Sequence, residues 1–269
     1  MIIGACMLPH PPVILPQVGR GEEKKIAKTT ESFMKAGELL AQLKPETIVI
    51  TTPHSIMYRD YFHISPGESA HGDMGLFRAP EVKFDLKYDT ELAGMISHMA
   101  EKKGIPAGTE GERDPELDHG VMVPLYFVNK LYKDYKLVRI GLSGLSLKKH
   151  VEFGRIIRDA VNETGRRVFF IASGDLSHRL KPEGPYGFND KGPLYDERIM
   201  DVMGDARFDK LLKFPDDLLE NAAECGHRSF CIMGGALEGL DVKPERLSHE
   251  DTFGVGYGVV TYKIEYSEM

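Results

Sequence analysis

Three runs of apolar and β-branched residues along this chain each lead into a loop that carries a histidine. The runs and their histidines are residues 2–8 with His10, residues 47–51 with His54, and residues 168–172 with His178. Continuous runs of this kind predict strands buried on both faces, as in a parallel sheet. Because open α/β folds place their ligands at the carboxyl edge of such strands, we expect the three histidines to converge on one crevice.

Between these runs, apolar positions recur at the spacing of helices. Between the first two runs the recurring residues are Ile26, Phe33, Ala36, Leu40 and Leu43. This spacing predicts a helix over residues 22–43 that covers one sheet face and completes a βαβ unit. By the same reasoning, further helices are predicted over residues 90–103, 121–131, 148–163, 195–203, 208–213, 216–223 and 227–240, and further strands over residues 137–140 and 254–264.

Other segments depart from this alternation of strand and helix. Short alternating pieces separated by glycine-rich turns occupy residues 61–89, which predicts an antiparallel excursion near the mouth of the site. An acidic loop follows at residues 108–117, and a loop rich in Gly, Pro and Asp at residues 175–193 is a candidate flap. Because no stretch has linker composition, we expect one α/β domain over residues 1–269. Its mostly parallel central sheet is flanked by helices, with the site at the carboxyl edge of the strands.

Composition and charge narrow the class of partner. The 269 residues are 42% hydrophobic and 28% charged, as in ordinary globular proteins, and the net charge is −7. With no basic cluster, this charge argues against nucleic acid and against a membrane surface, and favours a small molecule or another protein. We find no signal segment or spanning apolar run, so we expect a cytoplasmic protein. Three cysteines are too few for a disulfide framework.

The candidate chemistry is metal binding by histidine. His10 and His54 have prolines beside them, which stiffen the backbone that carries each ring. Such a pair needs an anionic third ligand, and Glu224 and Cys225 offer a carboxylate and a thiol just before a predicted helix. A carboxylate would complete a site for Fe(II), whereas the thiol, whose pKa we expect the helix to lower, would also suit zinc or copper. The glycines of residues 254–258 lack a following helix and are interpreted as structural.

Several of these motifs together resemble one family. They are His10 near the N-terminus, His54 after the second strand, Asp118-His119-Gly120, Ser177-His178 at a strand end, and an acidic or thiol residue before the helix with Gly235-Ala236-Leu237. In order and spacing they are similar to the class III, LigB-type extradiol ring-cleaving dioxygenases. The resemblance spans nearly the whole chain and implies a twisted central sheet. It also implies that two early histidines and a late glutamate bind Fe(II), and that the histidine matching His178 is the acid/base.

The third ligand departs from the dioxygenase pattern. The stretch from Glu224 to Arg228 is closer to the Memo branch, a related group in which a cysteine takes the ligand position. The aspartate three residues before His178, Asp175, also resembles the Memo pattern. The opening Pro-His-Pro-Pro is similar to proteins found alongside AMMECR-type and radical-SAM partners. Either Glu224 or Cys225 therefore remains a candidate for the third ligand.

The leading hypothesis is an Fe(II) oxygenase that opens the ring of an aromatic diol with O₂. His178 would move the phenolic proton, and Asp175 or His119 would orient His178 or the bound oxygen. The second hypothesis is a Memo-like metal- or redox-binding protein that works through a partner, and the third is a metal-assisted hydrolase that uses the same ligands. We also expect the chain to form a homo-oligomer.

Overall fold

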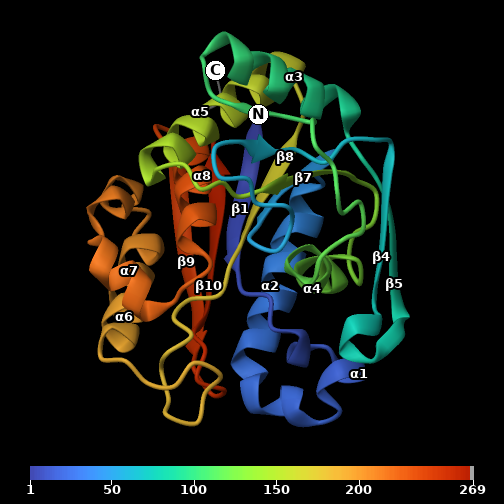
Figure 1. The fold of residues 1–269 in the computed structure, drawn as a ribbon. Coiled ribbons are helices and arrows are strands. Elements are labelled where there is room, and N and C mark those ends of the chain that lie inside the picture. The colour runs from blue at the N-terminus through green and yellow to red at the C-terminus, as the bar shows by residue number, and fades with distance from the viewer. Residues whose placement is uncertain (267–269) are drawn as a thin grey trace.

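The computed structural model describes residues 1–266 and centres on a six-stranded sheet (Figure 1). The strand order is β7-β2-β8-β1-β10-β9. The strands are β1 (Ile2–Leu8), β2 (Thr47–Thr52), β7 (Lys136–Gly141), β8 (Val168–Ser173), β9 (Asp241–Glu250) and β10 (Tyr257–Glu265). The first four run parallel to one another, whereas β10 is antiparallel to β1 and β9 is antiparallel to β10. The predicted α/β fold with a mostly parallel sheet is confirmed.

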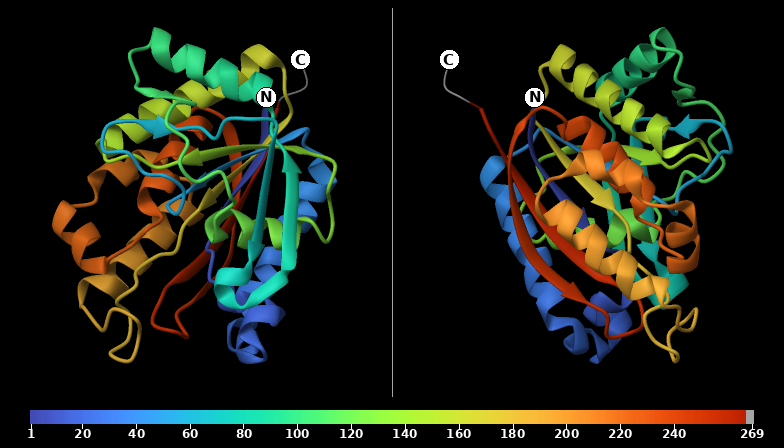
Figure 2. Two further views of the ribbon diagram at one scale, coloured as in Figure 1. Left: turned by 45° about the vertical axis from the view of Figure 1, so that its right-hand side comes forward. Right: turned by 90° about the vertical axis from the view of Figure 1, so that its left-hand side faces the viewer.

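Helices cover both faces of the sheet, and each face has its own hydrophobic cluster (Figure 2). The α-helices are α1 (Pro16–Gly19), α2 (Ala27–Leu43), α3 (Thr90–Lys102), α4 (His119–Val128), α5 (Leu147–Thr164), α6 (Lys191–Gly204), α7 (Asp216–Ala222) and α8 (His227–Leu237). Side chains of α2 and α4 belong to one cluster, and side chains of α3, α5, α6 and α8 belong to the other. Every residue of β1, β2 and β8 is buried between these layers, which explains their uninterrupted apolar runs.

Short elements complete the molecule. They are the 3₁₀ turns η1 (Pro12–Ile14), η2 (Glu22–Ile26), η3 (Gly75–Phe77) and η4 (Phe208–Lys213), and the strands β3 (Phe62–His63), β4 (Ser69–Met74), β5 (Ala79–Lys87) and β6 (Ala107–Gly108). The antiparallel β4–β5 hairpin is the excursion predicted from the alternating segments. β3 instead pairs in parallel with β6, which the sequence did not predict because each strand has only two residues.

Two differences in helix starts and one missed strand have physical reasons. The helix predicted from residue 22 begins as the 3₁₀ turn η2 and becomes α-helical only at Ala27. The helix predicted from residue 121 begins at His119. Asp118 just before it has an extended backbone, and its side chain accepts a hydrogen bond from Thr52, so the helical conformation starts at the next residue. β9 was not predicted, since its polar sequence with Pro244 is typical of a protected sheet edge rather than a buried strand. None of the helices described is long and apolar enough to cross a membrane.

Candidate metal centre

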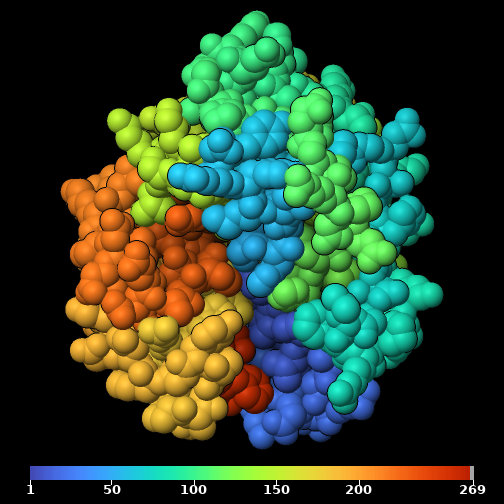
Figure 3. Space-filling view, viewed as in Figure 1, coloured from blue at the N-terminus to red at the C-terminus, as the bar shows by residue number. Residues whose placement is uncertain are grey.

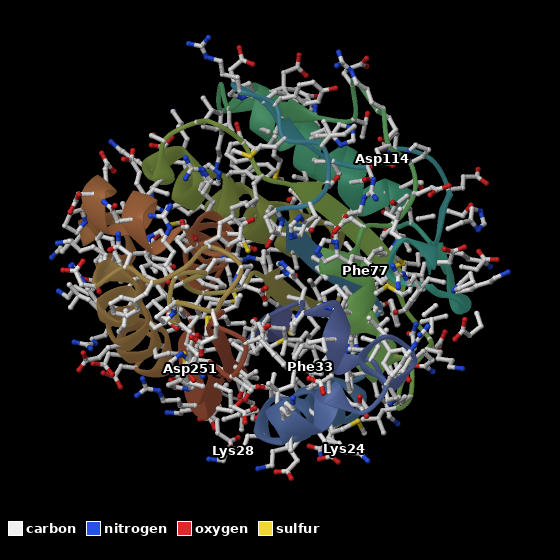
Figure 4. The ribbon with its side chains drawn as sticks, turned by 60° about the horizontal axis from the view of Figure 1, so that its bottom comes forward. Lys24, Lys28, Phe33, Phe77, Asp114 and Asp251 are labelled. Carbon is white, nitrogen blue, oxygen red and sulfur yellow. The ribbon has the colours of Figure 1, made fainter. Side chains whose placement is uncertain are left out.

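The carboxyl edge of the parallel strands carries the predicted site residues. His10 lies two residues beyond β1, His54 two beyond β2, and Asp175 two beyond β8. His119 is the first residue of α4, and Cys225 comes two residues before α8 begins. Figure 4 shows the molecule with this edge turned forward. The order of the strands in the sheet therefore brings together side chains that are far apart in the sequence.

Three imidazoles converge at this edge. The Nε2 atoms of His10 and His54 lie 2.9 Å apart, and one ligating nitrogen from each of His10, His54 and His119 lies within 4.8 Å of the others. The His54 and His119 rings are only 4.0 Å apart between centroids. The sequence placed His119 in an orienting role, and the geometry adds it to the nitrogens that could hold a metal. Three convergent imidazoles are a donor set that Fe(II), Zn²⁺ and Cu²⁺ all accept.

The ring of His10 is held in one tautomer by a buried serine. His10 is only 2% exposed, and its Nδ1 lies 3.0 Å from Ser173 Oγ. The single hydroxyl proton of Ser173 is donated to the carbonyl oxygen of Gly120 at 2.5 Å. Ser173 Oγ must therefore accept its second hydrogen bond from Nδ1–H of His10. The lone pair of His10 is left on Nε2, the atom that faces His54.

The surroundings keep these imidazoles neutral, which is the form that binds metal. Burial lowers the pKa of His10 well below its usual value, and the neighbouring His54 and His178 lower it further. Burial also lowers the pKa of His54, against the opposing effect of Asp118 and Asp175. The pKa of His119 falls to about 3, chiefly through burial. The residues present therefore fit a metal site rather than a cluster of imidazolium ions.

The two candidates for the third ligand have different surroundings. Sγ of Cys225 lies 3.7 Å from Nε2 of His10 and accepts a hydrogen bond from the backbone N–H of Asp175 at 3.3 Å. The carboxylate of Glu224 instead accepts from the backbone N–H of His227, the first residue of α8, at 2.6 Å. Burial raises the Glu224 pKa to about 7. Within the described residues, the Cys225 thiol lies within hydrogen-bonding distance of His10, whereas no hydrogen bond joins Glu224 to His10.

The expectation that α8 lowers the pKa of Cys225 is wrong. Burial raises the pKa of this thiol well above its usual value, and the negative charges of Asp175 and Glu224 raise it further. Burial is the main physical reason, and the backbone N–H of His227 at the start of α8 is bonded to the Glu224 carboxylate rather than to the thiol. A cation bound beside Cys225 would reverse this balance, since a coordinating thiol loses its proton.

Asp175 and His178 both lie close to His10. Asp175 Oδ1 accepts a hydrogen bond from the backbone N–H of His10 at 2.8 Å, which fixes the loop that carries the first histidine. His178 is close enough for its charge to affect the pKa of both His10 and Asp175. Its Nδ1 is buried and has no hydrogen-bond partner within residues 1–266. His178 therefore keeps a ring nitrogen that no other described residue uses.

A buried arginine, missed by the sequence analysis, fastens the acidic loop that leads into His119. Arg139 in β7 is 1% exposed and donates hydrogen bonds to the backbone carbonyls of Asp114, at 2.8 Å, and of Glu116. Its Nη1 also lies 3.9 Å from Asp118, whose Oδ1 accepts from Thr52 at 2.6 Å. In the sequence, the sign of this role was a cationic residue, Arg139, among the apolar residues of a strand. Ser173 left no such signal, because a serine at a strand end is common.

Comparison with known proteins finds relatives that align with most of the chain. It is 43% identical to protein CA_C1420 of Clostridium acetobutylicum over 96% of this chain, which spans about half (56%) of that relative. It is 22% identical to the 2-aminophenol 1,6-dioxygenase beta subunit of a Pseudomonas species, over 98% of this chain and 94% of that one. A MEMO1 family protein of Methanococcoides burtonii is 27% identical over 82% of this chain and 77% of its own length.

A solved structure and a family pattern complete the comparison. The uncharacterized protein JW3007 of Escherichia coli K12 has the same fold, with a TM-score of 0.62 at 17% identity, over 96% of this chain and 99% of that one. The family described as the catalytic LigB subunit of aromatic ring-opening dioxygenase matches residues 4–260, a range that includes every site residue described above. The chain therefore belongs to the LigB family.

Proposed function

We propose that this protein is an Fe(II)-dependent extradiol dioxygenase that opens the ring of an aromatic diol or aminophenol with O₂. One observation carries the proposal, namely the convergence of three neutral imidazoles within 4.8 Å at the carboxyl edge of a LigB-family sheet. The dioxygenase subunit among the relatives, which is named for 2-aminophenol, supports the choice of substrate class.

His10 and His54 would hold the metal through their Nε2 atoms. The lone pair of His10 Nε2 is available because its Nδ1–H is bonded to Ser173. Cys225 or Glu224 would add the anionic ligand, and His119 offers a further nitrogen. When bound, Fe(II) supplies adjacent positions where a catecholate and O₂ meet.

His178 would act as the general acid/base. Its Nδ1 forms no hydrogen bond within the described chain, so no described residue fixes the tautomer of this ring, which supports a role in accepting the phenolic proton of a substrate and returning a proton later. Asp175 would assist by holding the His10 backbone and by lying close to His178. These roles need no other titratable group.

The direct test is oxygen uptake by the iron-loaded protein. The protein would be loaded with Fe(II) under anaerobic conditions and mixed with catechol or 2-aminophenol, after which O₂ is admitted. We expect one O₂ consumed for each ring opened, together with the yellow absorbance of a ring-opened product. Substrate that survives unchanged, with no O₂ consumed by protein of verified iron content, contradicts ring cleavage.

A second candidate function is a Memo-like metal- or redox-binding protein without ring-cleaving activity. The observation that favours it is the 3.7 Å contact between Cys225 Sγ and His10 Nε2, since a cysteine occupies this position in the Memo branch. Metal content measured in Cys225→Ala and Glu224→Ala separates the two cases. Loss of metal only in the cysteine variant favours the Memo-like function, and loss only in the glutamate variant favours the dioxygenase.

The remaining expectations from the sequence stay predictions. A metal-assisted hydrolase would release product from an ester or amide without O₂, so an anaerobic assay of the same protein detects it. We also predict that zinc or copper could take the place of iron, that AMMECR-type or radical-SAM proteins are partners, and that the protein is a homo-oligomer located in the cytoplasm.

A further inference from the structure

Two segments on either side of the histidine cluster expose large apolar side chains. Leu76, at the tip of the β4–β5 hairpin, is 95% exposed, and Tyr186 and Phe188, in the loop after β8, are 62% and 55% exposed. Figure 3 shows the hairpin tip and this loop flanking the N-terminal segment on one face of the molecule. Single exposed apolar side chains are common and carry no argument by themselves, so what matters is which aromatic rings of these two segments contact the histidines.

On the hairpin side, Phe77 turns inward. Its half-buried ring lies 5.2 Å from the His119 ring between centroids, at an angle of 67°. Arg78 adopts a left-handed conformation and donates its backbone N–H to Gly75 at 2.9 Å, which closes the tight turn that aims Phe77 toward the site. Figure 4 shows Phe77 nearer the middle of this edge than Asp114 or Asp251. Phe77 is thus placed beside the metal-binding nitrogens, whereas its neighbour Leu76 faces solvent.

On the other side, Tyr186 lies against His178. The two rings are 5.4 Å apart between centroids and nearly perpendicular, at 88°. The turn that holds Tyr186 is closed by hydrogen bonds from Gly184 N to Lys181 O and from Gly187 N to Gly184 O.

The glycines near the C-terminal strand anchor the same loop. The backbone N–H of Leu180 donates to the carbonyl of Gly254 at 3.1 Å. A Cβ on Gly254 would come within 2.7 Å of Gly184 Cα, so the two backbones approach too closely for any side chain between them. This close approach accounts for glycine at residue 254 and holds the Tyr186 loop beside the site.

We propose that Phe77 and Tyr186 form two walls of the substrate pocket and select flat aromatic ligands over aliphatic metal chelators. This inference rests on the proposed function, because the ligand would be held at the same metal. Phe77 contacts His119 and Tyr186 contacts His178, so one aromatic ring lies beside each of these two histidines. Aromatic pairs stabilise one another at centroid distances of 4.5–7 Å through offset and edge-to-face contacts that an aliphatic ligand cannot make.

The test measures ligand binding without turnover. Protein loaded with redox-inactive Zn²⁺ would be titrated with 4-nitrocatechol by its optical shift, and with acetohydroxamate, an aliphatic chelator, by competition. We expect Phe77→Ala and Tyr186→Ala each to weaken 4-nitrocatechol binding by about two- to tenfold and to leave acetohydroxamate binding unchanged. Leu76→Ala, the exposed neighbour, is the matched control and should change neither. Phe77→Tyr and Tyr186→Phe retain a ring and should restore the affinity.

Several outcomes overturn the inference. They are an unchanged 4-nitrocatechol affinity in both alanine variants, an equal weakening of both chelators, and a wild-type protein that binds no 4-nitrocatechol. Failure of the proposed function gives a different result. Suppose that the iron-loaded protein opens no ring while the alanine variants still bind 4-nitrocatechol selectively more weakly. That result supports the role of Phe77 and Tyr186 and contradicts ring cleavage. If rings are opened and the variants bind 4-nitrocatechol with normal affinity, only the role of Phe77 and Tyr186 is contradicted.

Discussion

The two sides of the site differ in how firmly their histidines are held. His10 is buried, its backbone N–H bonds to Asp175 and its ring nitrogen bonds to Ser173. His178 lies on a loop with exposed aromatic residues, and its Nδ1 has no partner in the described chain. In the proposed function, the firmly held ring of His10 suits a metal ligand, whereas the free nitrogen of His178 suits a group that exchanges protons.

The largest effect expected is the loss of a ligand on the rigid side. His10→Ala should strip the metal and abolish any metal-dependent activity, because it removes the nitrogen on which His54 and Cys225 both converge. Elemental analysis of the purified variant measures this. The control is His98→Ala, which removes an exposed histidine of α3. Full metal content in the His10 variant would contradict the assignment of the histidine cluster as the metal centre.

A smaller effect is expected on the proton-exchanging side. His178→Ala should keep its metal and still bind a catechol, while turnover falls by about 10²–10⁴-fold, as is typical for a lost general acid/base. Metal content and single-turnover rates measured on the same preparation check both halves of this prediction. If the variant instead loses its metal, His178 is a ligand, and the assignment of Glu224 or Cys225 must be withdrawn.

The tautomer argument predicts an intermediate loss of metal affinity. Ser173→Ala removes the acceptor that holds Nδ1–H of His10, so metal should bind about 10–100-fold more weakly. A competition titration against a chromogenic chelator measures the affinity. Ser97→Ala, which removes a hydroxyl bonded within α3, controls for the general loss of a hydrogen bond. Equal affinities in the two variants would contradict the role of Ser173.

The last prediction concerns the pH dependence of stability rather than metal binding or turnover. The pKa of His119 is about 3 in the folded chain and about 6.5 when unfolded, so the unfolded chain binds more protons between these values. The depressed pKa therefore makes the free energy of unfolding fall as pH falls from 6.5 to 3, by up to about 1.4 kcal/mol per pH unit. Chemical unfolding of metal-depleted His119→Asn and wild-type protein across this window should show a shallower loss in the variant. Parallel curves would contradict the lowered pKa.

The apolar runs of the sequence were sufficient to predict β1, β2 and β8 and to place His10 and His54 just beyond two of these strands, whereas His178 lies five residues beyond β8. This worked because burial on both faces requires uninterrupted apolar residues, a local property of the chain. The polar edge strand β9 was missed for the same reason, since only its pairing with β10 makes it a strand.

The tertiary structure decided how the site is completed. Ser173 reaches His10 across 163 residues of sequence, and Cys225 reaches it across 215. No local pattern encodes which side chain will face which at these separations, because that depends on strand order and on competing partners such as the His227 N–H that holds Glu224. The sequence determined which strand ends carry histidines, and the packing of the sheet determined the atoms that surround them.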